Sequence, residues 1–134
     1  MSSMVLDCSS VLAWFFEDER DADALRLMDA LAAARIHVPP LWPYEIANAM
    51  LVAERRKRLK ADSITEGLSA MEALDIVVEP GKTMERDLLD LARQHSLSVY
   101  DASYLALSMQ LKVPLATRDS HLKRAAKVAG VKLF

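Results

Sequence analysis

The sequence predicts an α/β fold in which helices cover both faces of a mainly parallel sheet. Short apolar runs of strand length alternate along the whole chain with longer segments of helical periodicity. This alternation is typical of parallel sheets, because each crossover between parallel strands needs a connection as long as a helix. With 134 residues, of which 52% are hydrophobic, the chain is expected to form one domain over residues 1–134.

About five short strands are expected, each bounded by a polar residue or a turn. The first ends at Asp7, Pro39 and Pro40 stop the second, and Pro80-Gly81 turns the chain after the third. The expected strands are residues 4–6, 36–38, 76–78, 113–116 and 131–133.

Helices are expected between the strands, where apolar residues recur at helical spacing after a capping residue. Ser9 or Ser10 can cap the first helix, which carries the aromatic residues 14–16. One face of a helix cannot bury three adjacent aromatic side chains, so part of this group is expected at the surface. The later helices are expected at residues 21–34, 42–58 with Pro43 in the first turn, 62–73 capped by Asp62 or Ser63, 83–94, 101–111, and 120–128 ended by Gly130.

Charge and cysteine content limit the class of protein. The net charge of −2, from 19 acids against 17 bases, is not that of a dedicated DNA-binding domain. A cluster of bases at residues 55–60 is interpreted as a solvated helix end, with contact to RNA phosphates as the alternative. The single cysteine, Cys8, and the lack of a signal-like N-terminus favour the cytoplasm, and no segment is apolar enough to span a membrane.

Four acidic residues stand where ligands bind in parallel sheets. Asp7 follows the first strand directly, and Asp119 comes three residues after the fourth. Glu45 lies in the first turn of the helix after the second strand, and Asp101 opens the helix that leads into the fourth. Because ligands bind outside the carboxyl ends of the strands, we expect the four acids around one edge of the sheet.

Four carboxylates in one pocket predict a metal ion. Two unit charges about 4 Å apart repel by about 4 kcal/mol at an effective dielectric near 20. Hard oxygen ligands suit Mg²⁺ or Mn²⁺, and one or two such ions promote in-line hydrolysis of a phosphodiester. Ser9 and Thr117, each two residues from a site acid, are expected either to orient a carboxylate or to serve as a helix cap and a strand end.

Four fragments of the chain, in this order, resemble those of PIN-domain ribonucleases. They are VLDCSSVLAWF at residues 5–15, PYEIANAML at 43–51, YDASYLAL at 100–107 and LATRDSHL at 115–122. The compact length and the first fragment are most similar to VapC-type toxins of bacterial toxin–antitoxin modules. Cys8 stands where that family more often has a small residue such as alanine, and this departure removes no acid.

The resemblance implies a three-layer α/β/α sandwich with Mg²⁺- or Mn²⁺-dependent endoribonuclease activity. Its acidic metal site would consist of Asp7, Glu45, Asp101 and Asp119. It also implies a homodimer and a cognate antitoxin that covers the site and carries the DNA-binding part, so that direct DNA binding by this chain is not expected. Part of the aromatic group at residues 14–16 is then expected at an antitoxin or dimer contact.

Other functions stay open at this point. A phosphatase with Asp7 as its nucleophile would need a second acid at the position of Ser9. A non-catalytic module that binds RNA or protein would have lost a site acid, and all four are present. A PIN nuclease in RNA processing, without a toxin role, is not separated from a toxin by the sequence. His37, His95 and His121 show no zinc spacing and are expected to be structural or exposed.

Overall fold

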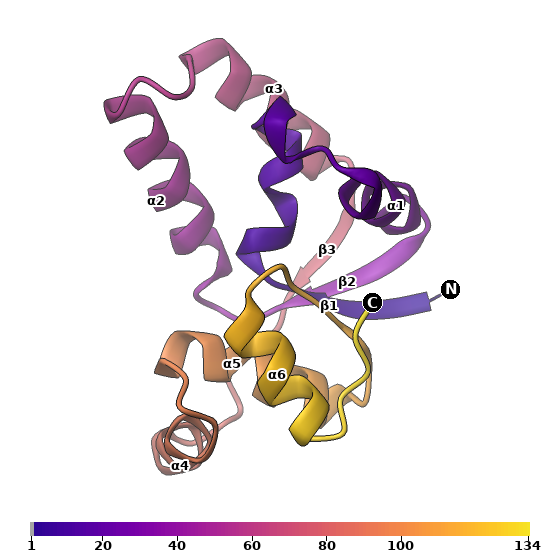
Figure 1. Cartoon of the computed structure of the whole chain (residues 1–134), viewed down its shortest axis with the longest axis vertical. Coiled ribbons are helices and arrows are strands. Elements are labelled where there is room, and N and C mark those ends of the chain that lie inside the picture. The colour runs from indigo at the N-terminus through magenta and orange to yellow at the C-terminus, as the bar shows by residue number, and fades with distance from the viewer. Residues whose placement is uncertain (1) are drawn as a thin grey trace.

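A four-stranded, wholly parallel sheet lies at the centre of the protein in the computed structural model, which describes residues 2–134 (Figure 1). Its strand order is β3-β2-β1-β4. The strands are β1 (Ser2–Leu6), β2 (Ala34–Val38), β3 (Asp75–Val78) and β4 (Leu115–Ala116). The predicted parallel α/β class is confirmed, with four strands where about five were expected. In place of the strand expected at residues 131–133, only Leu133 forms a parallel bridge, with Leu115.

Helices flank the sheet on two sides and complete the three layers. Figure 1 shows α1, α2 and α3 on one side of the sheet and α4, α5 and α6 on the other. None of the helices in residues 2–134 is both long and apolar enough to cross a membrane. The helices are η1 (Cys8–Trp14) and η2 (Glu17–Glu19), both 3₁₀, and α1 (Ala22–Leu31), α2 (Trp42–Arg55), α3 (Ala61–Glu72), α4 (Glu85–His95), α5 (Val99–Leu111) and α6 (Ser120–Val128).

The first helix differs from the prediction in type and in cap. It is a 3₁₀ helix whose N-cap is Asp7, not Ser9 or Ser10, because the backbone stays extended up to Asp7, at φ −81° and ψ 148°. The hydroxyl of Ser9 points back to Asp7 and so does not cap the helix.

Several other boundaries are shorter or shifted for local reasons. The helix α1 was expected to reach residue 34. Because Ala34 is the first residue of β2 and pairs with β1, α1 ends earlier, at Leu31. Lys57 adopts a left-handed backbone, φ 59°, which ends α2 before residue 58. Lys60 is the N-cap of α3 in place of Asp62 or Ser63, and α4 covers residues 85–95 instead of 83–94.

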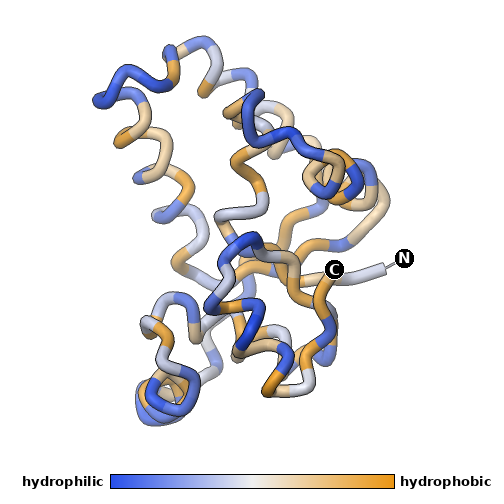
Figure 2. Tube along the Cα trace, in the orientation of Figure 1, coloured by the Kyte–Doolittle hydropathy of each residue, from blue (hydrophilic) through white to orange (hydrophobic). Residues whose placement is uncertain are grey.

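The hydrophobic core lies between the sheet and α5 on one side and η1 on the other. Val5, Leu6 and Ile36 of the sheet and Leu105 of α5 are completely buried. Figure 2 shows the hydrophobic strands at the centre of the molecule and the hydrophilic loop between α2 and α3 at its periphery. Of the aromatic group, Phe15 and Phe16 are buried and Trp14 is half-buried, as expected for a helix that cannot hide all three.

Gly67 of α3 lies against the core ring of Phe15, which predicts a steric limit at this position. A Cβ atom at residue 67 would lie 2.4 Å from two ring atoms of Phe15. Because that ring is buried, Gly67→Ala is expected to lower the free energy of unfolding in urea by about 1–3 kcal/mol. Gly81→Ala is the control, since its Cβ would meet only Pro40, at 3.7 Å. Equal stability of the two variants would contradict this packing.

Candidate functional site

Asp7 and Thr117 lie side by side at the carboxyl edge of the sheet. Each follows a strand directly, and β1 pairs with β4 in the register Leu6 to Ala116. The backbone N–H of Asp7 also donates to the carbonyl oxygen of Ala116, at 2.9 Å. Strand pairing therefore brings together two residues that lie 110 positions apart in the sequence.

The side chain of Asp7 is buried, with 5% of its surface exposed, and is held by two hydroxyl groups. Its Oδ2 accepts hydrogen bonds from Ser9 Oγ and Thr117 Oγ1, each at 2.7 Å. Ser9 Oγ also accepts the backbone N–H of Arg118, at 3.0 Å. These contacts tie η1 to the loop between β4 and α6 and hold the Asp7 carboxylate in one orientation.

Asp119 and Asp101 lie at the N-termini of two helices. Asp119 is the N-cap of α6: its side chain accepts the N–H of Leu122 at 2.9 Å, and its own N–H donates to Thr117 Oγ1 at 3.1 Å. Asp101 lies in the first turn of α5, and its N–H donates to the N-cap hydroxyl of Ser98 at 3.0 Å. The expectation that Asp101 opens the helix is two residues late, because α5 begins at Val99. Helix N-termini stabilise negative charge, which suits both carboxylates.

Glu45 lies in the first turn of α2 and is hydrogen-bonded to a buried tyrosine of α5. The hydroxyl of Tyr104 donates to Glu45 Oε1, at 2.5 Å. Burial, followed by this hydrogen bond, raises the pKa of Tyr104, so the phenol keeps its proton. Sequence analysis missed this residue, although a buried tyrosine hydroxyl usually needs a partner and this one lies three positions after Asp101.

Electrostatic effects connect the four acids. Burial is the largest cause that raises the pKa of Asp7, Glu45 and Asp101 above their usual values. Neighbouring carboxylates add to it: Asp119 raises the pKa of Asp7, and both Asp7 and Asp101 raise that of Glu45. The pKa of Asp101 is raised by Asp7 and by Asp119. The charges of neighbouring carboxylates therefore disfavour the ionised forms of Asp7, Glu45 and Asp101.

The four acids could offer carboxylate oxygens to a metal ion. Within residues 2–134, no three acidic, histidine or cysteine side chains are gathered closely enough to make a ready-formed metal group. Mg²⁺ usually keeps several waters and takes one or two carboxylates plus phosphate oxygens, so it does not require a closed cage of protein ligands. A bound cation would also offset the cost of ionising the buried Asp7.

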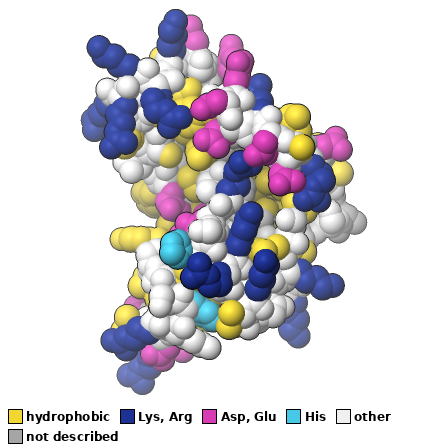
Figure 3. Space-filling view, viewed as in Figure 1, with side chains coloured by type: hydrophobic (Ala, Val, Ile, Leu, Met, Phe, Trp, Pro, Cys, Tyr) yellow, Lys and Arg dark blue, Asp and Glu magenta, His cyan; other side chains and the backbone are white. Residues whose placement is uncertain are grey.

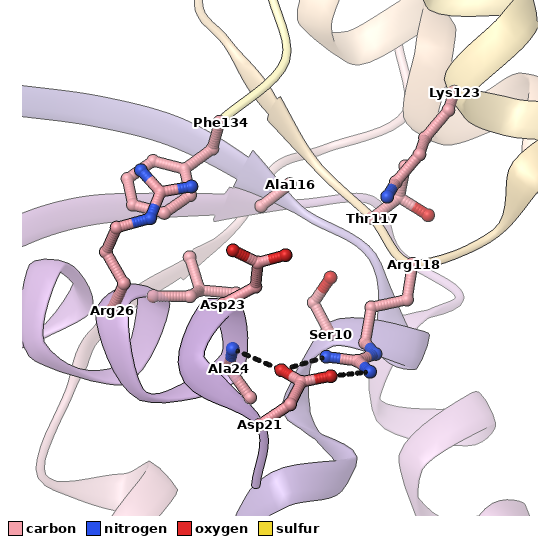
Figure 4. A pocket seen from close by; sticks show the side chains of 11 residues that line it. Ser10, Asp21, Asp23, Ala24, Arg26, Ala116, Thr117, Arg118, Lys123 and Phe134 are labelled. Carbon is pink, nitrogen blue, oxygen red and sulfur yellow. Dashed lines mark hydrogen bonds and ion pairs between the residues drawn. The ribbon is translucent and has the colours of Figure 1, made fainter. Parts of the chain in front are cut away.

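Two basic residues that follow β4, Arg118 and Lys123, line a cavity beside α1. Arg118 forms a two-pronged ion pair with Asp21, at 3.0 and 2.5 Å (Figure 4). Asp21 also caps α1 by accepting the N–H of Ala24. Both residues line a cavity of about 180 Å³, into which Lys123 also points. Figure 3 shows lysine and arginine side chains gathered over α6, beside acidic side chains.

Cys8 is half-buried, His37 is hydrogen-bonded to a glutamate, and His121 is exposed. Burial, followed by the charges of Glu45 and Asp7, raises the pKa of Cys8 to about 12, so its thiol stays protonated. His37 pairs with Glu79 at 2.6 Å. Coulombic interaction with the nearby ring of His121 is the smallest of the effects on the pKa of Asp101, and it lowers that pKa. These placements agree with the structural or exposed roles expected for these two histidines.

Comparisons with known proteins agree with the fold and with the motifs. The family model described as the PIN domain matches residues 4–128. Ribonuclease VapC3 of Pyrobaculum aerophilum is 30% identical over 121 residues, which cover 89% of this chain and 91% of the relative. Ribonuclease VapC1 of Mycobacterium tuberculosis is 35% identical over 121 residues, which cover 81% of this chain and 91% of the relative.

A solved structure supports the same fold at lower sequence identity. The crystal structure of PAE2754 from Pyrobaculum aerophilum matches with a TM-score of 0.69 and 21% identity, over 92% of this chain and 79% of that one. At this identity the likeness concerns the fold alone. Together with the family match over almost the whole chain and the curated relatives at 30–35% identity, it shows that this chain belongs to the PIN-domain family and resembles its VapC ribonucleases.

Proposed function

We propose that the protein is a metal-dependent endoribonuclease and the toxin component of a type II toxin–antitoxin module. The observation that carries this proposal is the buried carboxylate of Asp7 at the sheet edge: Asp119 raises its pKa, and its own charge raises the pKa of Glu45 and of Asp101. Within residues 2–134, no lysine or arginine forms an ion pair with any of the four. A divalent cation is the partner that this charge distribution calls for. The curated relatives named above are ribonucleases.

Asp7, Glu45, Asp101 and Asp119 would hold Mg²⁺ or Mn²⁺. When bound, the ion would neutralise the RNA phosphate and lower the pKa of an attacking water. The hydroxyl groups of Ser9 and Thr117 donate to Oδ2 of Asp7 and would keep this carboxylate in one orientation toward a cation. The exposed bases Lys123, Arg124 and Lys127 on α6 would attract the RNA backbone toward the acids.

The other partners follow from the resemblance to VapC-type toxins. We propose that the protein acts in the cytoplasm as a homodimer and that an antitoxin inhibits it by covering the acidic site. The half-buried Trp14 is the member of the aromatic group that remains available for such a contact. A phosphatase mechanism is disfavoured, because Ser9, at the position of the second acid, donates its hydroxyl to Asp7.

Cleavage of a structured RNA tests the proposed activity. The wild-type protein is expected to cut RNA with Mg²⁺ or Mn²⁺ and to stop in excess EDTA. Asp101→Asn removes a proposed metal ligand and is expected to slow cleavage by at least about 100-fold. Asp87→Asn, which removes an exposed acid of α4, is the control and should cut at the wild-type rate. Cleavage that persists in excess EDTA would refute the mechanism.

The stability of Asp7→Asn tests the electrostatic cost of the site. In the folded state the pKa of Asp7 is raised above 3.8, so its ionisation destabilises the fold as pH rises above that value. In EDTA at about pH 7, Asp7→Asn is therefore expected to be more stable by about 0.5–2 kcal/mol. The difference should disappear as pH falls toward about 3, where the carboxyl group is protonated in both states.

Adding metal to the same two proteins tests whether a cation offsets the cost of ionising Asp7. Millimolar Mg²⁺ is expected to raise the melting temperature of the wild type, because the ion binds the folded state only. The melting temperature of Asp7→Asn should rise less, so the difference in stability between Asp7→Asn and the wild type should narrow. The wild type and Asp7→Asn should be compared by thermal unfolding, with Glu66→Gln, which removes an exposed acid from the middle of α3, as a control that follows the wild type. If Asp7→Asn is less stable than the wild type in EDTA at neutral pH, the claim that ionised Asp7 destabilises the fold is contradicted.

A further inference from the structure

Tyr104 connects the two helices that carry Asp101 and Glu45. It lies on α5, three residues after Asp101, so the two side chains project from neighbouring positions of the helix surface. Its side chain is completely buried, and its hydroxyl reaches α2 to donate to Glu45 Oε1. α5 therefore contributes one site acid directly and holds another, which lies 59 positions away in the sequence.

Tyr104 is rigid and Glu45 is flexible, and this difference suits the hydrogen bond between them to positioning Glu45. Glutamate is a flexible side chain that loses about 1.5–2 kcal/mol of rotamer entropy when it is fixed. Tyrosine has a rigid ring, and here the ring is immobilised by the core. The phenol hydroxyl donates to only one carboxylate oxygen of Glu45, so it leaves Oε2 free.

We infer that Tyr104 is a positioning residue, whose hydroxyl holds Glu45 with its second carboxylate oxygen directed to the acidic site so that a divalent cation meets a prearranged ligand. This inference rests on the proposed metal-dependent function. Groups that orient metal ligands typically change metal affinity or activity by about 10–100-fold when they are removed. A purely structural role would require only some acceptor for the buried hydroxyl, and it would leave metal affinity unchanged.

The test is the affinity of the protein for Mn²⁺, measured by isothermal titration calorimetry without RNA. Tyr104→Phe keeps the ring and removes the donor, and it is expected to weaken Mn²⁺ binding by about 10-fold or more. Tyr100→Phe is the matched control, because Tyr100 lies one turn earlier on α5 and is 67% exposed. Its affinity should equal that of the wild type. Glu45→Gln should weaken binding, and adding Tyr104→Phe to it should have little further effect.

A second measurement separates positioning from a folding defect. RNA cleavage by Tyr104→Phe should need more Mn²⁺ for half-maximal rate but approach the wild-type rate at saturating Mn²⁺. A damaged fold would lower the saturated rate instead, and unfolding in EDTA would reveal it. The inference is overturned if the wild type binds Mn²⁺ and Tyr104→Phe binds it equally well. If the wild type itself binds no Mn²⁺ and cuts no RNA, the proposed function fails instead.

Discussion

The pairing of β1 with β4 is the constraint on which the rest of the site depends. It places Asp7 beside Thr117, and the loop that follows brings Asp119 to the start of α6. A shift of this register by one residue would turn Asp7 to the opposite face of the sheet. Although β4 has only two residues, its pairing with β1 is sufficient to fix which side chains meet at the carboxyl edge of the sheet.

This arrangement has an energetic cost that the surrounding contacts only partly offset. Burial of Asp7 disfavours its ionised form, and nearby carboxylates add to that effect. The hydroxyl groups of Ser9 and Thr117 stabilise the ionised form without supplying a positive charge. Arg118, which directly precedes Asp119 in the sequence, forms an ion pair with Asp21 instead. Ionisable groups with perturbed pKa values often mark functional sites, and the cost of burying Asp7 is one that the proposed cation would offset.

Much of this fold could be predicted from the sequence, because apolar runs such as Val5–Leu6 and helical spacing on α6 are local signals. The same holds for Asp7 and Asp119, whose positions after strands placed them at one edge. Local signals could not reveal that residues near Val131 would barely pair with β4, since pairing depends on where the chain returns after Gly130. Nor could they reveal the hydrogen bond from Tyr104, which depends on how α5 packs against α2.

The most direct test of this account is anomalous diffraction from crystals of the protein soaked in MnCl₂. The account predicts an anomalous peak bounded by the carboxylates of Asp7, Asp101 and Asp119, with Glu45 beside it. The peak should disappear in crystals of Asp7→Asn soaked in the same way. Manganese bound only elsewhere in wild-type crystals, with these carboxylates left apart, would contradict the claim that the four acids share a divalent cation.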